Sequence, residues 1–159
     1  MTNYYVRTKF VPERNKNKLV ENKIYKLMHH DISLNFGNII SEIGNEIVLC
    51  LPFSAYLDNK SWELLEEISR SDLITLLSQT KNSIFSVKFI KKDGTERKLT
   101  GRFGVKKHLK HEDRKPTVNT DKFFVIYDMV KKDYRAVNKE TIFEAKIKGK
   151  NYIIKEGIK

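Results

Sequence analysis

The chain has 159 residues, of which 40% are hydrophobic and 32% are charged, and this composition is that of a folded globular protein rather than a disordered or fibrous one. No run approaches the roughly 18 consecutive apolar residues of a membrane-spanning helix, and the N-terminus has no apolar segment of a secretory signal. A single cysteine, Cys50, excludes an internal disulfide framework and a cysteine-rich zinc site, so we expect a protein of a reducing cytoplasm with no membrane association.

The net charge of +11 lies entirely in the second half of the chain. Residues 1–80 hold nine basic and ten acidic residues, whereas residues 81–159 hold 22 basic and ten acidic residues. Residues 81–115 alone hold twelve basic residues and four acidic ones. A surplus concentrated in this way indicates a polyanionic partner, most often nucleic acid. The alternative is that the lysines cover a solvated face.

Residues 1–57 are predicted to form a small β module. Apolar runs at 4–6, 10–11, 24–27, 38–42 and 46–51 are typical of short strands, and the run at 31–36 alternates apolar and polar residues. Residues 12–23 are polar and predict a loop. Spacing of this kind is loosely similar to a KOW or Tudor-like barrel.

Residues 58–80 are predicted to form a helical connector. Ser61 is placed to cap a helix whose early turns carry three glutamates, and Ser69 or Ser71 is placed to start a second segment. Apolar residues recur at helical spacing through residues 61–79.

Residues 84–103 predict a β-hairpin. A three-residue loop, Lys92 to Gly94, pairs Val87 with Leu99 and keeps the apolar faces of both strands together, which a two-residue loop does not. The same register places Lys88 opposite Lys98 on the outward face. Like charges across a ladder are unfavourable unless they are solvated, as on a protected sheet edge, or face phosphates.

The stretch from 104 to 117, GVKKHLKHEDRKPT, is the most basic part of the chain. It predicts either a solvated loop or a basic arm that contacts the phosphate backbone. His108 and His111 with two neighbouring acids form a weak metal-ligand pattern, as does the pair His29 and His30, and we expect neither to bind a metal.

Residues 121–154 predict further strands, including a nearly continuous apolar run at 123–127 and shorter runs at 134–137, 145–148 and 152–154. The whole sequence therefore predicts a mainly β protein with a short helical connector (α+β). It is expected to contain two small SH3-like or Tudor-like barrels, in residues 1–57 and in the basic segment 81–159, joined by residues 58–80.

Two segments carry a resemblance to a known family. Residues 86–110 contain the hairpin with its KKDG turn and the GVKKHLK segment, and residues 123–142 contain a VIYDM…YR…TI block. Both resemble a family of small phage-encoded domains described as an Sm-like SH3 β-barrel and related in name to the WYL domains. The resemblance covers about residues 71–148 and implies a fold more than an activity. The chain lacks a Trp-Tyr-Leu triplet.

The length, the charge and the two-module layout also resemble those of a DNA-binding early transcription modifier of phages. This resemblance implies action on host or phage transcription, in the nucleoid of the host's cytoplasm. Host transcription or nucleoid proteins are then further expected partners.

The residues do not predict an enzyme. The chain has no nucleophile elbow, P-loop, dinucleotide-binding or zincin motif, and Cys50 lies in an apolar run where a buried structural thiol is expected. We therefore expect no catalytic residue, no cofactor and no bound metal.

The leading hypothesis is sequence-independent binding of double-stranded DNA through phosphate contacts, because lysine dominates the basic residues and base readout favours Arg, Asn or Gln. The expected contacts are Lys88, Lys91, Lys92, Arg97, Lys98, Arg102, Lys106, Lys107, Lys110, Arg114, Lys115 and Arg135, with Lys131 and Lys132 as an extension.

Three further possibilities stay open. Tyr127 and Phe103 are candidates for stacking on bases if the ligand is single-stranded, with core packing as the alternative. A second possibility is a module that binds and inhibits a host protein, in which an exposed Trp62 or Tyr56 makes the specific contact. A third possibility is RNA binding, as in other Sm-like barrels.

Overall fold

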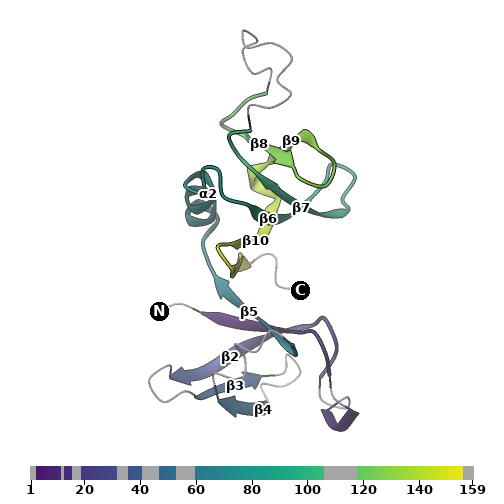
Figure 1. The fold of residues 1–159 in the computed structure, drawn as a ribbon. Helices are drawn as coiled ribbons and strands as arrows, with labels where there is room; N and C mark the ends of the chain where they lie inside the picture. The colour runs from purple at the N-terminus through teal and green to yellow at the C-terminus, as the bar shows by residue number, and fades with distance from the viewer. Residues whose placement is uncertain are drawn as a thin grey trace. The chain divides into compact units, whose positions relative to one another are not determined.

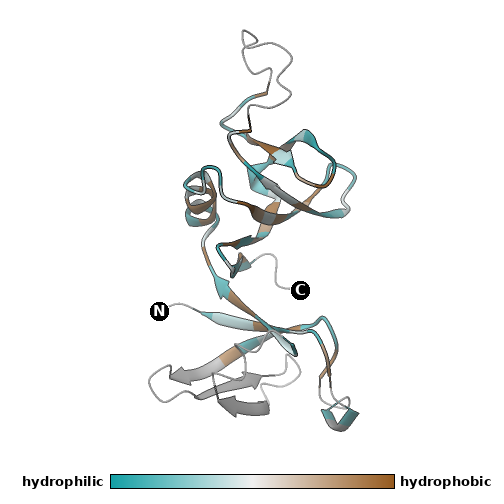
Figure 2. Cartoon of the chain, viewed as in Figure 1, coloured by the Kyte–Doolittle hydropathy of each residue, from teal (hydrophilic) through white to brown (hydrophobic). Residues whose placement is uncertain are grey.

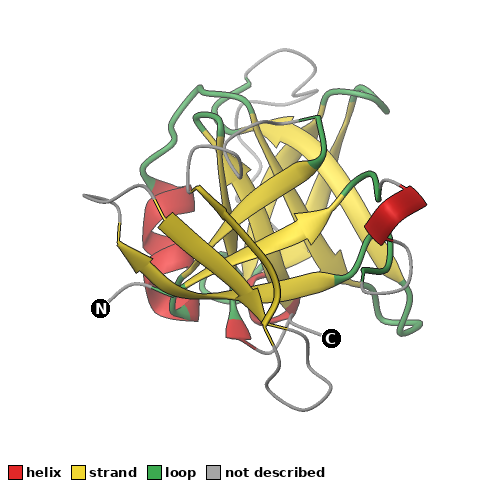
Figure 3. Ribbon diagram, turned by 90° about the horizontal axis from the view of Figure 1, so that it is seen from below, coloured by secondary structure: helices red, strands yellow, loops and turns green. Residues whose placement is uncertain are grey.

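The computed structural model describes residues 3–11, 13–15, 19–31, 36–40, 47–52, 60–105 and 118–155, and for residues 14, 28–31, 36–40 and 47–52 it describes the backbone alone. The chain divides into two compact units, one from Met1 to Glu67 together with the last two residues, and one from Ile68 to Gly157. Figures 1 and 3 show that strands dominate the described chain, and α2 is the α-helix among the described residues. The prediction of a mainly β protein with a short helix is therefore confirmed.

Unit 1 is an antiparallel sheet with the strand order β4-β3-β2-β1-β5. Its core is formed by apolar residues of β1 and β2, by the segments between them and by the first residue of β5. The expected strands near residues 4, 24, 38 and 46 are all present, whereas 10–11 lies outside any strand. The expectations for residues 32–35 and 53–57 lie outside the described residues. The bounds are Tyr4–Thr8 (β1), Glu13–Asn15 (the 3-10 helix η1), Ile24–Asp31 (β2), Phe36–Ile40 (β3), Ile47–Pro52 (β4) and Trp62–Glu67 (β5).

The predicted helix over 61–79 is wrong in its first half, because residues 62–67 form strand β5. This strand pairs with β1 from Tyr4–Glu66 to Thr8–Trp62. The pairing buries Trp62, which is 6% exposed, and gives two glutamates partners across the strands. Arg7 donates to Glu63 at 2.6 Å and the hydroxyl of Tyr5 donates to Glu67 at 2.8 Å. Tertiary pairing thus overrides the helix propensity of a Leu- and Glu-rich segment.

Unit 2 holds the helix and six antiparallel strands in the order β11-β10-β6-β7-β8-β9. No pairing among its described residues joins β9 to β11, and the order in unit 1 is open in the same way, so the prediction of two closed barrels is not confirmed. The bounds are Arg70–Ser78 (α2), Phe85–Ile90 (β6), Glu96–Arg102 (β7), Phe123–Asp128 (β8), Asp133–Asn138 (β9), Lys139–Thr141 (the 3-10 helix η2), Ile142–Ile147 (β10) and Lys150–Ile153 (β11).

Helix α2 confirms the second half of the predicted helix over 61–79. The side chain of Ser69 accepts from the backbone N–H of Asp72 at 3.1 Å, which is the expected N-cap. Leu73 and Leu77 are buried, and they pack with residues of β6 to β10 in the core of unit 2. The helix therefore belongs to the core of this unit rather than to a free connector.

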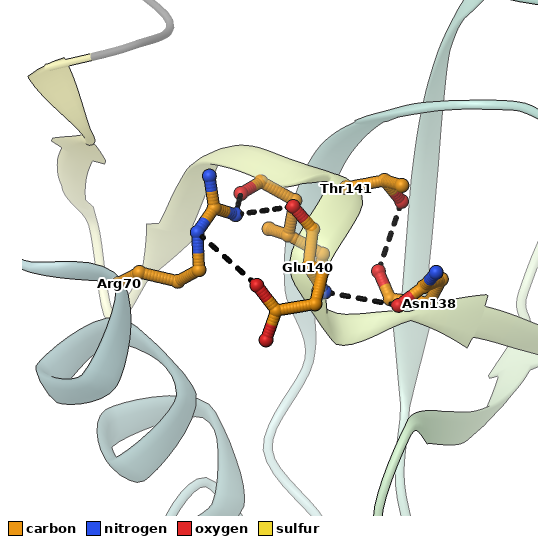
Figure 4. Close-up of polar contacts among 5 residues, drawn as sticks. Arg70, Asn138, Glu140 and Thr141 are labelled. Carbon is orange, nitrogen blue, oxygen red and sulfur yellow. Dashed lines mark hydrogen bonds and ion pairs between the residues drawn. The ribbon is translucent and has the colours of Figure 1, made fainter.

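Arg70 fastens the start of α2 to η2 (Figure 4). One of its terminal nitrogens donates to the backbone oxygens of Glu140 at 2.6 Å and Ile142 at 2.7 Å, and its Nε lies 3.7 Å from the Glu140 carboxylate. η2 is itself capped by Asn138, whose side chain accepts from Glu140 N–H and whose carbonyl accepts from Thr141. Charge-assisted bonds of this kind hold η2 in a fixed position relative to the helix.

The β6–β7 hairpin has the predicted register. Val87 pairs with Leu99 and Lys88 with Lys98, and the backbones of Lys91 and Thr95 meet across a three-residue loop. Gly94 has φ of 81°, the left-handed conformation expected there. Figure 2 shows the hairpin turn as hydrophilic, with the hydrophobic residues of unit 2 along its strands and α2.

The β6–β7 and β8–β9 hairpins of unit 2 meet at Gly101. Among the described residues, β7 and β8 form two cross-strand pairs, Gly101 with Asp128 and Arg102 with Tyr127. A Cβ on Gly101 would lie 2.5 Å from both the side chain of Ile126 and the backbone oxygen of Tyr127. Only glycine therefore allows this approach of the β6–β7 hairpin to the β8–β9 hairpin.

Replacing Gly101 with alanine is expected to lower the free energy of unfolding by about 3 kcal/mol, the upper part of the range for overpacked sites. Urea denaturation followed by circular dichroism measures the loss. Gly94→Ala is the control, because nothing lies within 4 Å of its added Cβ and only its backbone angle is strained, which costs about 1 kcal/mol. An equal loss in the two variants would show that β7 and β8 do not meet this closely.

Candidate nucleic-acid interface

A hollow of about 440 Å³ opens in unit 2 and is lined from both hairpins. The β6–β7 hairpin contributes the residues on either side of its turn, while the start of β8, most of β9 and the end of η2 form the rest. β7 pairs with β8 at Gly101 and Arg102, and Met129 N–H just after β8 donates to the Thr100 oxygen; among the described residues, the part of the hairpin nearer its turn has no backbone pairing with β8. The anchored η2 then supplies Thr141 to the wall, and its N-cap Asn138, the last residue of β9, also lines it.

Four cations line the hollow, and all four were predicted as phosphate contacts: Lys91, Lys92, Arg97 and Arg135. They come from two sequence segments about 40 residues apart, which the hairpin contact brings together. None of the residues described in the lining is acidic. The arrangement creates a positive, partly enclosed surface of the kind that attracts anions.

Carboxylates accompany three of these cations but lie outside the lining. Lys91 is 3.0 Å from Asp93, and Arg135 is 3.8 Å from Asp133. The side chains of Asp93 and Asp133 are 59% and 65% exposed. Exposed ion pairs are weak and exchange readily with solvent or another anion, so both cations stay available to a phosphate.

Arg97 is held more firmly, by the buried carboxylate of Asp128 at 3.5 Å. The other oxygen of Asp128 accepts from the backbone N–H groups of Val130 and Lys131 at 2.9 and 3.0 Å. Asp128 therefore both closes the β8–β9 turn and orients Arg97 from the second hairpin. Removing Arg97 would leave a buried charge without its ion-pair partner, so its contribution to binding is hard to separate from stability.

Arg135 has a donor that the described residues do not satisfy. Its Nε is buried and makes no hydrogen bond in the described part of the chain. An unsatisfied buried N–H costs about 1–3 kcal/mol. A ligand that offers an oxygen at this wall would relieve that cost.

The rest of the hollow is aromatic and apolar. Its aromatic residues are Phe123, Tyr134 and the nearly buried core residue Phe89, and Ile90 and Ala136 are its aliphatic residues. The Tyr134 hydroxyl donates to the backbone oxygen of Val105. Burial, and secondarily the neighbouring Tyr127, raise the pKa of Tyr134 above its ordinary value, so the ring is neutral at physiological pH.

Three other predicted contacts are described but do not line the hollow. Lys88 lies between Lys98 on β7 and Glu144 on β10, and its Nζ is 2.8 Å from the buried Glu144 carboxylate. The Glu144 carboxylate therefore offsets the repulsion between Lys88 and Lys98, which the hairpin register places opposite each other. Lys98 is exposed, whereas Arg102 is half-buried and its Nε makes no hydrogen bond in the described part of the chain.

The remaining five predicted contacts lie outside the described residues: Lys106, Lys107, Lys110, Arg114 and Lys115. The histidine pattern at His108 and His111 falls in the same segment. Lys131 and Lys132, the expected extension, are exposed in the β8–β9 turn. The described chain therefore brings together four of the twelve predicted residues.

Neither of the two residues considered for base stacking, Phe103 and Tyr127, lines the hollow. Phe103 packs on Phe85 and Phe124, with ring centroids 4.9 and 5.3 Å away, and belongs with the core. Tyr127 contacts the edge of the Tyr134 ring at 5.4 Å but does not line the hollow. The missed signal is the β8–β9 register, which puts alternate residues of both strands on one outward face.

Two more predictions concern single residues. Trp62 is buried in unit 1, so the hypothesis that it is an exposed protein contact is wrong. Tyr56 and the side chain of Cys50 lie outside the described residues.

The described chain holds no group of three or more His, Cys, Asp or Glu residues that could bind a metal. Within it, no helix is long and apolar enough to cross a membrane.

The turn beside the hollow is expected to weaken in acid. Thr95 donates to Asp93 from its hydroxyl at 2.6 Å and its N–H at 2.9 Å, and with Lys91 these bonds hold the pKa of Asp93 well below its usual range. The contribution of these bonds to the stability of the fold is therefore complete above the ordinary aspartate pKa of about 4. It is lost as pH falls below that value toward the lowered pKa of Asp93.

Asp93→Asn keeps an acceptor but removes the charge that responds to pH. Near neutral pH we expect the variant to have a lower melting temperature than the unmodified chain. The difference between the two melting temperatures should narrow as pH falls below about 4. Thermal unfolding measured at a series of pH values tests this. A gap that stays constant into acid would contradict the assigned bonds.

No curated protein sequence and no solved structure matches the chain. One family model does match, over residues 73–143, a stretch that covers just under half of the chain and runs from α2 into β10. It contains the β6–β7 hairpin, β8, β9 and η2, and thus every residue that lines the hollow. The predicted resemblance is confirmed over this stretch, which is similar to the WYL_2 family of Sm-like SH3 beta-barrel fold.

Proposed function

We propose that the chain is a non-enzymatic DNA-binding protein that holds its ligand mainly through the phosphate backbone, with little reading of sequence. The observation that carries the proposal is the convergence of four cations on one hollow whose described lining has no acid. Lys and Arg at such a surface neutralise phosphates and release counterions, which gives affinity without sequence information.

The charge distribution supports the same function over a larger area. Residues 81–159 carry twelve more basic than acidic residues, so long-range attraction of a polyanion acts on the second half of the chain. Most of these cations are lysines, which act as point charges on phosphates, whereas base recognition favours the bidentate groups of Arg, Asn and Gln. Lys106 to Lys115 would extend the interface.

The biological setting follows from the resemblance. We propose that the protein is phage-encoded, acts in the nucleoid of the host's cytoplasm, and modulates transcription or DNA organisation by coating DNA or displacing host proteins from it. Its expected partners are then duplex DNA and, through DNA, host transcription or nucleoid proteins. An inhibitory module for an acidic host protein is the alternative.

Salt titration of binding to a random-sequence duplex tests the proposal. The site variant is Lys91→Gln, Lys92→Gln and Arg135→Gln, and the control is Lys146→Gln, Lys148→Gln and Lys150→Gln, three exposed lysines of β10, β11 and their turn. Both variants lower the net charge from +11 by three. Arg97 is kept because Asp128 needs it.

The unmodified chain is expected to lose affinity steeply between about 50 and 200 mM salt. The site variant should flatten the slope of log K against log salt by about two to three, roughly one for each phosphate that is no longer neutralised, and the control should flatten it by less than one. Equal flattening by both variants would show that the charge acts diffusely. Absence of binding to duplex, single-stranded DNA and RNA at about 50 mM salt would overturn the proposal in favour of a protein partner.

A further inference from the structure

The walls of the hollow offer two kinds of contact. Cations from both hairpins bound it, and the half-buried aromatic residues Phe123 and Tyr134 line it together with Phe89, which is 8% exposed and also belongs to the core. A duplex presents phosphates on its outside while its bases stay stacked inside. Phosphate binding alone therefore explains the cations but gives the rings nothing to contact.

An unpaired nucleotide fits both features. Its base has a flat π surface that stacks on aromatic side chains whatever its sequence, and its phosphate lies one sugar away. The hollow, at about 440 Å³, has the size of a small-molecule site, since such pockets run from about 300 to 1,000 Å³. Binding of this kind needs no sequence readout, in agreement with the lysine-rich surface.

Two nitrogen donors of the wall suit the same ligand. The Nε of Arg135 is buried and makes no hydrogen bond in the described part of the chain. The side-chain oxygen of Asn138 is fixed by Glu140 N–H at 3.0 Å, which orients the amide in the wall (Figure 4). A phosphate or base oxygen would accept from either nitrogen.

The outward face of β8 and β9 continues from the hollow. Cross-strand pairs Phe123–Asn138, Val125–Ala136 and Tyr127–Tyr134 alternate with inward residues such as the fully buried Ile126. Val125 is 37% exposed, so apolar surface remains open beside the hollow. The bases next to the one in the hollow can pack against this apolar surface.

We infer that the hollow receives an unpaired base together with its phosphate, so that the chain binds single-stranded nucleic acid more tightly than duplex. This inference rests on the proposed nucleic-acid binding and names the form of the ligand. Duplex is bound through the same cations, but the base must first be unstacked to enter the hollow, which weakens the complex.

The test compares a labelled oligothymidine with a duplex of the same length by fluorescence anisotropy, using the full chain at about 50 mM salt. Phe123→Leu removes a ring from the hollow, and Phe143→Leu removes a ring of similar exposure that does not line it. Neither substitution alters charge. A second pair guards against misfolding: Ala136→Ile fills the hollow at an exposed position, and Val130→Ile enlarges an exposed residue in the turn of the same hairpin that does not line the hollow.

We expect the unmodified chain to bind the single strand about tenfold or more tightly than the duplex, since stacking one base contributes about that factor. Phe123→Leu and Ala136→Ile should each weaken single-strand binding about five- to tenfold with the salt slope unchanged, and both controls should leave it within twofold. Duplex affinity should barely change in any of them.

Equal or tighter binding of the duplex, or equal losses in the hollow variants and their controls, would overturn the inference while leaving phosphate binding intact. Failure of the proposed function is a separate result, because then neither ligand binds.

Discussion

The close approach of β7 and β8 at Gly101 is the constraint on which the rest of unit 2 depends. Because Gly101 has no Cβ, β7 can lie this close to β8. A Cβ at this position would be only 2.5 Å from the backbone oxygen of Tyr127. This contact joins two hairpins that are distant in sequence, and their outer ends then form the hollow. Arg70 completes the wall from another direction, because it ties η2 to α2.

Buried acids decide which cations of this surface are available. Glu144 engages Lys88 at 2.8 Å and Asp128 engages Arg97 at 3.5 Å, and both acids are almost fully buried. Ion pairs of Lys91 and Arg135 are exposed instead, and Lys92 is an exposed turn residue. The formal charge therefore overstates the number of cations available to an anion. Among the four cations that line the hollow, Lys91, Lys92 and Arg135 are more available than Arg97.

The sequence predicts local features of this protein better than its long-range contacts. The hairpin register, the αL glycine and the Ser69 cap follow from alternation and turn chemistry, which act within a few residues. Strand β5 could not be predicted in this way, because its partner β1 lies about 60 residues earlier and outweighs helix propensity. The cations of the hollow were found from charge, but Phe123 and Tyr134 were not, because their shared face depends on the β8–β9 register.

The central claim is that the hollow of unit 2 is the place where nucleic acid binds. Chemical-shift mapping of the ¹⁵N-labelled chain during titration with a short oligothymidine tests it directly. We expect the largest amide shifts at Phe89 to Lys92, at Arg97 and from Tyr134 to Asn138. Shifts concentrated instead on the β10–β11 turn or on unit 1, with the hollow unmoved, would contradict it.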